Sequence, residues 1–480
     1  MQKLLFLSGF IFSFLHFSYS QNPLVKEWDK RFGGTYDDYL TSFQQTQDGG
    51  YILGGYSASG IGGDKTQASW GGHDYWIVKT DSLGIKQWDK DFGGTDLDYF
   101  HWIQQTADGG YILGGYSYSD SSGDKTQNLR GSADYWIVKT DSLGNKQWDK
   151  DFGGTYLDYL HSLQQTADGG YILGGSSLSG IGGDKTQAAW GGSDYWIIKI
   201  DSIGNKQWDK DFGGNANDRL SCVIQTTDGG YILGGYSQSD SSGDKTQPSW
   251  GWYDYWIVKT DSLGNKQWDK DLGGTSPEDQ FGYISQTSDG GYLIAGTSYS
   301  NISGDKTENN LGQEQTWVIK TDINGIKQWD KTLHTGGHDE AGFAIQTSDG
   351  CYAMANTTEA GIGGDKTQPS WGYQDFWIVK FCDTTVTTSI TQLPQLPQLP
   401  FSILPNPATE TIKLKWNKEQ KEKQITINDL FGREVLKEVS GTKYQVPSTK
   451  GQDFKIDISF LTPGIYFLKA GNEVKKFVKE

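Results

Sequence analysis

The sequence is poor in methionine and cysteine and, after its first twenty residues, has no long apolar run. Its 480 residues include 2 methionines and 3 cysteines, and only 35% of them are hydrophobic. No segment repeats its apolar residues with the 3.6-residue period of a helix, which argues against a leucine-rich helical core. The chain has instead 65 glycines, 19 tryptophans and 26 tyrosines. That composition is typical of many short strands joined by tight turns.

Basic residues are also scarce over most of the chain. Residues 21–400 contain 27 basic and 49 acidic residues, a net charge of −22, whereas residues 401–480 have a net charge of +4. Binding to nucleic acid needs a basic surface that neutralises phosphates, so no nucleic-acid partner is expected. The acidic body leaves cations and neutral ligands such as glycans as candidates.

The one long apolar run lies at the start of the sequence. Lys3 precedes an apolar stretch at residues 4–17, and Ser18-Tyr19-Ser20 forms a small-x-small cleavage site. The run is shorter than the ~20 residues needed to span a bilayer. No cysteine follows the cleavage site, so a lipoprotein anchor is not expected either. Residues 1–20 are therefore predicted to be a signal peptide that directs export into the periplasm.

Three short phrases recur six times with a period of 60 or 61 residues. The first phrase, Gln-Trp-Asp-Lys or a close variant, contains Trp28, Trp88, Trp148, Trp208, Trp268 and Trp329. The second, Asp-Gly-Gly-Tyr, begins at Asp48, Asp108, Asp168, Asp228 and Asp289, with a degenerate copy at Asp349. The third, Tyr-Trp-Ile-Val-Lys or similar, contains Trp76, Trp136, Trp196, Trp256, Trp317 and Trp377. Six such copies indicate a repeat fold.

One repeat unit divides into four strands. The strands predicted in the third unit are residues 158–166, 171–177, 194–201 and 206–212. Asp168-Gly169-Gly170 supplies the positive φ that a tight hairpin requires. Gly174-Gly175 would let an aromatic side chain of a neighbouring blade approach closely. Four antiparallel strands per repeat form the blade of a β-propeller, so residues 21–382 are predicted to be all-β, as a six-bladed β-propeller.

The phase of the repeat predicts how the ring closes. The mature chain opens with a fourth-type strand, Glu27–Phe32, and the repeats end with a third-type strand, Asp375–Phe381. The N-terminal strand is therefore expected to complete the sixth blade, which would leave no unpaired sheet edge.

The repeat phrases also resemble those of a known family. The matching segments are Gln165–Leu173, Asp194–Lys199, Asp201–Gly204 and Trp208–Gly214. They are similar to a family of secreted bacterial propeller repeats, and the resemblance implies the fold but no particular activity. A looser similarity to quinoprotein propellers rests on Asp141–Gly144 and Trp148, which are spaced one residue shorter than in that family. No quinone cofactor is expected for this reason.

The three cysteines are an odd set in an exported protein. Cys351 and Cys382 fall on neighbouring predicted strands of the last blade and can form a disulfide there, and the sequence leaves this pairing open. Cys222 is expected to be a small buried residue.

The composition changes after Cys382. Residues 383–401 contain three Gln-Leu-Pro copies and predict an extended linker. Beyond the linker, a small Ig-like β-sandwich is predicted, with strands at residues 412–416, 424–428, 454–458 and 464–470.

This last segment carries four further sequence blocks. They are Leu404–Ala408, Ile427–Val435, Leu461–Phe467 and Val474–Val478. With these blocks, residues 402–480 resemble the type A C-terminal sorting domain of the type IX secretion system of Bacteroidota. The resemblance implies the secretion machinery as a partner, passage across the outer membrane, removal of the domain, and release or attachment at the cell surface.

The long loops between second and third strands, and the short connections between blades, should emerge on one face of the propeller. Loops on a rigid scaffold usually carry function, and a tryptophan precedes the third strand in four of them. The candidate ligand-binding residues are Trp70, Trp190, Trp250 and Trp371, with Arg130 at the same position in blade two and Trp252 in blade four. These tryptophans either stack on sugars or fold over their own loops onto the next blade. The Gly-Asp-Lys-Thr phrase in every loop favours the second arrangement.

A ring of aspartates marks the entry to each first strand. Its members are Asp38, Asp98, Asp158, Asp218, Asp279 and Asp339. Six carboxylates around a channel mouth would suit a hard cation such as Ca²⁺. The more frequent role of such aspartates is to accept hydrogen bonds from nearby backbone amides.

Catalytic motifs are missing from the sequence. The histidines have no metal-ligand spacing, and no nucleophile elbow, zinc-protease motif or phosphate loop occurs. Glu278 and Glu340 are the only loop-face acids confined to one or two blades. The leading hypothesis is a monomeric, non-enzymatic binding or scaffold protein for a glycan or protein ligand. The alternatives are a hydrolase or lyase acting on polysaccharide from the channel mouth, and a quinoprotein dehydrogenase.

Overall fold

The chain divides into two compact units, Met1–Cys382 and Asp383–Glu480. The computed structural model describes residues 28–276, 278–348, 350–370 and 375–382 of the first unit. In the second unit it describes residues 401–404, 408–416, 425–428, 435, 453–462, 464–470 and 473–479. The predicted signal peptide, almost all of the predicted linker, and Trp371 lie outside these residues. No helix in the described ranges is long and apolar enough to cross a membrane.

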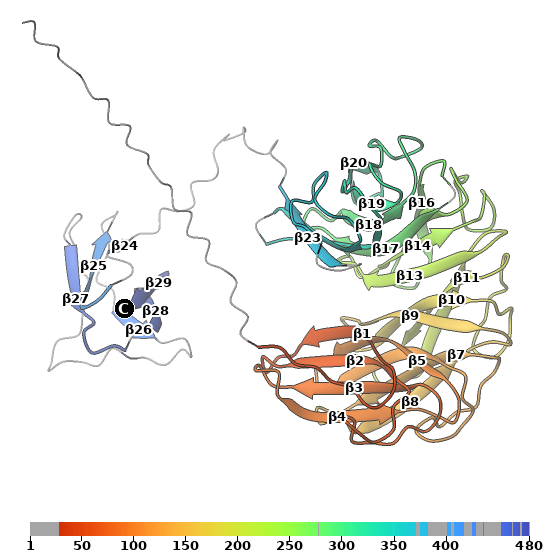
Figure 1. Ribbon diagram of the computed structural model, residues 1–480, viewed down its shortest axis with the longest axis horizontal. Helices are drawn as coiled ribbons and strands as arrows, with labels where there is room; N and C mark the ends of the chain where they lie inside the picture. Colours follow the sequence, from red (N-terminus) through yellow and green to blue (C-terminus); the bar gives the residue numbers. More distant parts are fainter. Residues whose placement is uncertain are drawn as a thin grey trace, which may run out of the picture. The chain divides into compact units, whose positions relative to one another are not determined.

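Six antiparallel sheets follow one another along the first unit (Figure 1). Blade one is β1 (Asp38–Gln45), β2 (Tyr51–Ser57), β3 (Asp74–Thr80) and β4 (Lys86–Phe92). Blade two is β5 (Asp98–Gln105), β6 (Tyr111–Ser117), β7 (Asp134–Thr140) and β8 (Lys146–Phe152). Blade three is β9 (Asp158–Gln165), β10 (Tyr171–Ser177), β11 (Asp194–Ile200) and β12 (Lys206–Phe212).

The remaining three blades follow the same plan. Blade four is β13 (Asp218–Gln225), β14 (Tyr231–Ser237), β15 (Asp254–Thr260) and β16 (Lys266–Leu272). Blade five is β17 (Asp279–Gln286), β18 (Tyr292–Ser298), β19 (Gln315–Thr321) and β20 (Lys327–Thr332). Blade six is β21 (Asp339–Gln346), β22 (Tyr352–Thr358) and β23 (Asp375–Phe381). The prediction of an all-β repeat fold with six propeller blades is confirmed, and the four strands predicted for the third unit match within one residue.

The turn between the first two strands is held by one aspartate and one lysine. In blade three, Gly169 has a φ of 82°, and Asp168 Oδ1 accepts a hydrogen bond from the Gly170 amide at 3.0 Å. Lys199 of β11 forms an ion pair with Asp168 across 2.9 Å. The Asp-Gly-Gly phrase thus fixes the hairpin and ties it to the third strand.

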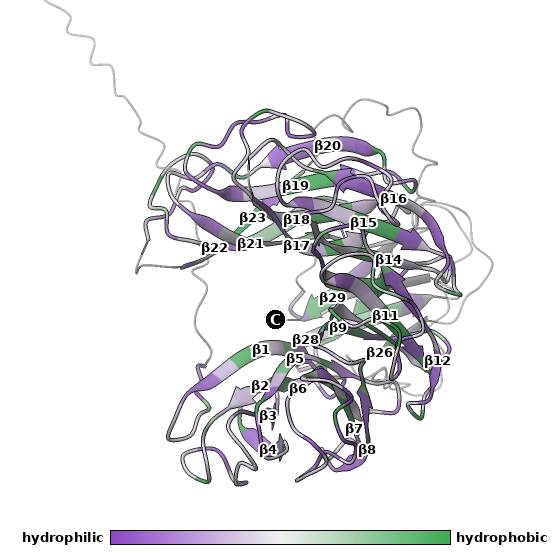
Figure 2. Ribbon diagram, turned by 90° about the vertical axis from the view of Figure 1, so that its right-hand side faces the viewer, coloured by the Kyte–Doolittle hydropathy of each residue, from purple (hydrophilic) through white to green (hydrophobic). Residues whose placement is uncertain are grey.

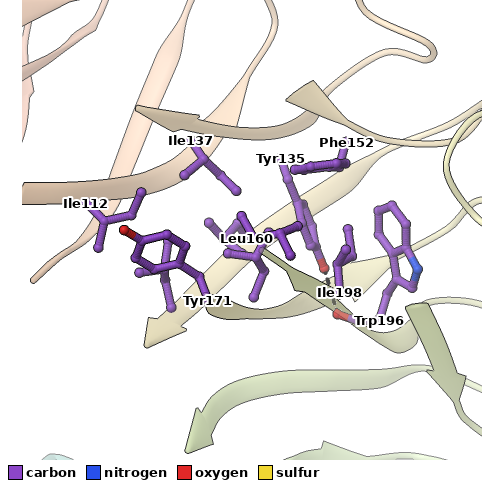
Figure 3. Close-up of a cluster of buried hydrophobic side chains, with 11 residues drawn as sticks. Ile112, Tyr135, Ile137, Phe152, Leu160, Tyr171, Trp196 and Ile198 are labelled. Atoms are coloured by element: carbon purple, nitrogen blue, oxygen red, sulfur yellow. Dashed lines mark hydrogen bonds between the residues drawn. The ribbon is translucent and has the colours of Figure 1, made fainter. Parts of the chain in front are cut away.

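Neighbouring blades pack through paired aromatic rings (Figure 3). Tyr135 of β7 lies 4.9 Å from Trp196 of β11 between ring centroids, and its hydroxyl donates to the Trp196 carbonyl at 3.0 Å. The glycines of β10 make room for side chains of both neighbouring blades. A Cβ on Gly174 would lie 2.6 Å from Leu220 of blade four. A Cβ on Gly175 would lie 2.7 Å from the Tyr135 hydroxyl of blade two. The predicted close approach of an aromatic side chain is confirmed at Gly175, whereas Gly174 faces the aliphatic Leu220.

Glutamines at the end of the first strands join one blade to the next. The backbone amide of Gln165 in β9 donates to Gln104 Oε1 of β5 at 2.7 Å. The side-chain oxygen of Gln165, Oε1, accepts from the backbone amide of Ala107 at 2.9 Å. Gln225 and Gln164 repeat the first of these bonds at the next junction. The junctions are therefore fixed by directional hydrogen bonds as well as by apolar burial.

The predicted closure of the ring is not found. The sixth sheet has three strands, and residues 28–32 form no strand. Trp28 instead packs on Tyr51 of blade one at 5.8 Å, just as Trp88 packs on Tyr111 of blade two. Residues 28–32 follow blade one because the Trp28–Tyr51 contact needs only that blade. Pairing with β23 would need the two ends of the arc of blades to meet.

The six blades form an open arc (Figure 2), and the blades at its two ends have exposed apolar residues. Leu40 and Phe43 of β1 are 61% and 66% exposed, whereas Leu160 and Leu163, their equivalents in β9, are buried. Ile378 of β23 is likewise exposed, although its equivalents in blades one to four are fully buried. The six blades therefore have two free faces, one on blade one and one on blade six.

Cys351 and Cys382 form a disulfide in the last blade. Cys351 directly precedes Tyr352, and Cys382 directly follows Phe381. Tyr352 and Phe381 are cross-strand partners in β22 and β23. Cys222 is a buried free cysteine, as the sequence predicts.

The second unit contains two three-stranded antiparallel sheets. Their strands are β24 (Phe401–Leu404), β25 (Thr411–Trp416), β26 (Ile425–Asn428), β27 (Asp453–Asp457), β28 (Gly464–Ala470) and β29 (Glu473–Lys479). The sheet orders are β24-β25-β27 and β26-β28-β29. Side chains from both sheets, including Ile412 and Leu468, share one apolar core. β24 and β29 were not predicted from the sequence, and the Ig-like connectivity stays a prediction.

Candidate functional site

The loop tryptophans are tethered but remain accessible. The indole N–H of Trp70 donates to Asp124 of blade two at 3.0 Å, and Trp190 makes the same bond to Asp244 at 2.9 Å. Trp70, Trp190 and Trp250 are nevertheless 54%, 57% and 52% exposed. Each indole is thus fixed on the neighbouring blade while part of its ring faces solvent, so the structure combines features of both predicted arrangements.

A cavity lies beside each of two loop tryptophans. The cavity next to Trp70 measures about 550 Å³, and the one next to Trp190 measures about 560 Å³. In the first, Lys90 Nζ donates to Asn145 Oδ1 of blade two at 3.1 Å; Lys210 and Asn265 repeat this bond in the second. Both cavities therefore offer an aromatic ring, an ammonium group and an amide.

The other loop positions differ from this pattern. Arg130 occupies the tryptophan position in blade two, where it forms ion pairs with Asp151 and Asp184 at 2.9 Å each. Trp252 is 63% exposed and lies parallel to the Tyr253 ring at 6.2 Å. The structure thus gives Arg130 internal partners and leaves Trp252 open to solvent.

Each of blades one to four buries one lysine and two aspartates behind the loop between its second and third strands. Lys65 forms an ion pair with Asp91, and both side chains are inaccessible. Asp74 shares a hydrogen bond with Asp91. One lysine can neutralise only one of two adjacent carboxylates, and burial raises the pKa of Asp91 to about 8. The same set recurs as Lys125, Asp134 and Asp151, as Lys185, Asp194 and Asp211, and as Lys245, Asp254 and Asp271.

The aspartate ring acts as a set of local braces. Asp158 accepts hydrogen bonds from the Gly154 amide at 2.7 Å and from the Ser179 hydroxyl at 3.0 Å. Burial raises its pKa to about 6. Asp98, Asp218 and Asp279 bond the equivalent amides, and so does Asp38, while Asp339 accepts from the Thr335 hydroxyl. In the described part of the chain, no group of three His, Cys, Asp or Glu side chains could hold a metal ion.

The beginning of the first strands, here called the channel mouth, holds residues that were not predicted from the sequence. Five tyrosines form a chain of ring contacts across blades one to three, with centroid distances of 4.6 to 5.3 Å. They are Tyr39, Tyr56, Tyr99, Tyr116 and Tyr159. Beside them, His101 lies 5.2 Å from His161 and 5.4 Å from Tyr116. The mouth is therefore predominantly aromatic in this sector.

These positions are where the six repeats differ from one another. The second residue of the first strand is Tyr39, Tyr99, Tyr159, Arg219, Gln280 and Glu340 in successive blades. The fourth residue is Thr41, His101, His161, Ser221, Gly282 and Gly342. Aligning the units and marking their differences would have found this site. A search for shared phrases instead selects residues that hold the blades together.

A cavity of about 570 Å³ opens at this mouth. Its walls include His101, Tyr159, His161, Arg219 and Tyr236. Burial lowers the pKa of His101 to about 4, and burial with the nearby His101 and Arg219 charges lowers that of His161 to about 3. Both imidazoles are therefore neutral near pH 7 and can donate or accept hydrogen bonds.

The two acids that the sequence singled out lie in blades five and six. Glu278 Oε2 accepts a hydrogen bond from Gln280 at 3.4 Å, and the Glu340 side chain lies outside the described residues. The structure adds two acid–histidine contacts in blades five and six, between Glu314 and His338 at 2.5 Å and between Asp365 and His334 at 3.6 Å.

Solved structures with similar folds include proteins of several kinds. A protein of unknown function from Dyadobacter fermentans is 12% identical, covers 73% of this chain and 96% of its own, and has a TM-score of 0.39. The phage phi92 endosialidase is 10% identical, covers 92% and 76%, and has a TM-score of 0.35. A GH43_1 enzyme from Xanthomonas citri is 11% identical, covers 66% and 88%, and has a TM-score of 0.27. Likenesses at this level assign no activity to this chain.

Comparison with curated proteins gives one short match. The regulatory protein FlaEY of Caulobacter vibrioides is 28% identical over 139 residues, which are 27% of this chain. The match spans only 14% of the length of FlaEY.

The C-terminal segment has the clearest relationship. Residues 402–480 match the secretion system C-terminal sorting domain family. This match covers both sheets of the second unit except Phe401, the first residue of β24. The predicted destination, outside the cell or at its surface, is thereby confirmed. The chain therefore carries propeller blades followed by a type IX secretion system C-terminal sorting domain.

Proposed function

We propose that the exported blades form a non-enzymatic binding protein that holds an extended extracellular glycan through its loop tryptophans. The observation that carries this proposal is the pair of equivalent cavities at Trp70 and Trp190. In each, a half-exposed indole is fixed by its N–H, so its free ring area is held in place before any ligand arrives.

The chemistry of these cavities suits a neutral sugar. The C–H face of a hexose packs on an aromatic ring, and its hydroxyl groups need donors and acceptors nearby. Lys90 uses one of its three donors on Asn145, so others remain for a ligand. A neutral polymer also avoids repulsion from the acidic body of the molecule.

Repetition makes several weak contacts effective together. The two equivalent cavities belong to blades one and three, and Trp250 of blade four offers a third accessible indole. A polymer that reaches two of them gains from the high effective concentration of the second site. Single contacts can then be weak while the whole polymer binds firmly.

The experiment is affinity electrophoresis of the mature protein in gels that contain neutral polysaccharides. Removing one ring (Trp70→Ala or Trp190→Ala) should weaken binding several-fold, and the double variant should lower it by about 100-fold. Leu311→Ala is the matched control, because Leu311 occupies the tryptophan position in blade five. Equal retardation of the wild type and the double variant in every gel would contradict the proposal.

The same samples also test the enzymatic alternative. A hydrolase would release new reducing ends from the bound polysaccharide, and a lyase would release unsaturated products. We expect neither over prolonged incubation.

A further inference from the structure

Arg219 of β13 is the one cation on the walls of the 570 Å³ cavity at the channel mouth. In blades one to three its position in the first strand is occupied by tyrosine. Arg219 is an exposed residue, and its side chain forms a hydrogen bond with that of Tyr236. The repeat thus changes from an aromatic residue to a permanent positive charge at a single blade.

The surroundings of Arg219 differ from those of the cations that line the loops. Arg130 has two carboxylate partners, and each buried lysine of blades one to four has one. The groups with the largest effect on the pKa of Arg219 are the tyrosines Tyr236, Tyr253 and Tyr159, and Arg219 forms no ion pair with a carboxylate among the described residues. An unpaired guanidinium in an aromatic cavity is a binding site for an anion.

The rest of the cavity indicates what carries that anion. Neutral His161 and the hydroxyls of Tyr159 and Tyr236 provide donors and acceptors for sugar hydroxyl groups. The cavity volume of about 570 Å³ falls in the range of small-molecule sites. A carboxylate attached to a hydroxylated ring therefore matches the cavity in charge and in polarity.

We propose that this cavity binds an acidic saccharide, with Arg219 holding its carboxylate and the flanking tyrosines contacting its ring. This site is separate from the loop tryptophans, and the inference does not depend on them. It gives the molecule a second specificity, for the charged residue of a glycan rather than for its neutral chain.

Isothermal titration calorimetry of the mature protein tests the inference. The probes are D-glucuronate, D-galacturonate and trigalacturonate, with D-glucose and D-galactose as neutral matches. At least one uronate should bind at least tenfold more tightly than its neutral match, and added salt should reduce the difference.

Three variants assign the effect to the guanidinium. Arg219→Gln and Arg219→Tyr place residues that blades five and three carry at the same position, so the fold should tolerate both. Each should reduce uronate binding to the level of the neutral sugar. Arg219→Lys keeps the charge but loses the fork geometry and should give an intermediate affinity.

Arg31→Gln is the matched control, because Arg31 is exposed on the N-terminal segment outside the cavity. It should leave uronate binding unchanged. The inference is overturned if uronates and neutral sugars bind equally, if no uronate binds at millimolar concentration, or if folded Arg219→Gln binds as the wild type does.

Discussion

At the scale of single residues, position decides what a tryptophan does. Trp196 of β11 is fully buried, whereas Trp190, six residues earlier, is 57% exposed. The paired glycines of the second strands predicted that aromatic rings of the neighbouring blade would pack closely between blades. The sequence left the loop tryptophans open between two roles, since the bond from Trp190 to Asp244 joins different repeats.

Replacing these two tryptophans should therefore have different costs. Trp196→Ala removes a ring from the interface between blades and should lower the unfolding free energy by about 3–5 kcal/mol. Trp190→Ala should lower it by less than about 1 kcal/mol, because only one partly exposed contact is lost. Urea unfolding of both variants, followed by circular dichroism, measures the difference. Equal costs would contradict the assignment of Trp190 as an accessible residue.

At the scale of the structural element, a blade depends on its neighbours for burial. The strand boundaries follow from the repeated phrases and from the glycine turns, so they could be predicted closely. The path of residues 28–32 could not, because the segment can contact either blade one or β23 and local sequence favours neither. The channel mouth was missed for a related reason: its residues come from several blades and share no phrase.

The disulfide should stabilise the last blade most. It closes a segment with a sequence separation of 31, and a loop of this size corresponds to about 3–4 kcal/mol of unfolded-state entropy. The double variant Cys351→Ser/Cys382→Ser should therefore exchange the backbone amides of β23 faster than the wild type, as hydrogen-exchange mass spectrometry can show. Cys222→Ser should leave β23 exchange unchanged. Unaltered protection in the double variant would show that β23 is held by other contacts.

At the scale of the whole molecule, four copies of the buried lysine–aspartate set make stability depend on pH. Asp91, Asp151, Asp211 and Asp271 have pKa values raised from 3.8 to about 8 by burial. Between these values the folded chain keeps protons that the unfolded chain has lost. Their stabilisation is complete below pH 3.8 and is lost as the pH rises through about 8. The turn aspartates, such as Asp168 with a pKa of about 2, are ionised throughout this interval.

The protein should accordingly unfold at a higher temperature at pH 5.5 than at pH 8. The difference in unfolding free energy should exceed about 1.4 kcal/mol, the value of one group shifted by one unit. Asp254→Gln/Asp271→Thr copies the residues of blade five, Gln315 and Thr332, and should remove about a quarter of the dependence. Differential scanning calorimetry at both pH values provides the test. Greater stability at pH 8 would show that the aspartates are ionised in the folded state.

The contacts between blades also affect how the gene of such a repeat protein can evolve. The first four junctions use the same glutamine and tyrosine positions, so a gene that gained or lost whole units among these blades would still encode compatible interfaces. Between blades five and six, Thr316 and Asn356 take the places of the tyrosine and a glycine. The loops of blades one, three and six share Gly-Ile-Gly-Gly, and those of blades two and four share Asp-Ser-Ser-Gly, so blades that are not neighbours keep the same loop sequence. The mouth residues lie outside these shared contacts. Mutation can therefore alter what the molecule recognises while the scaffold that presents it is copied unchanged.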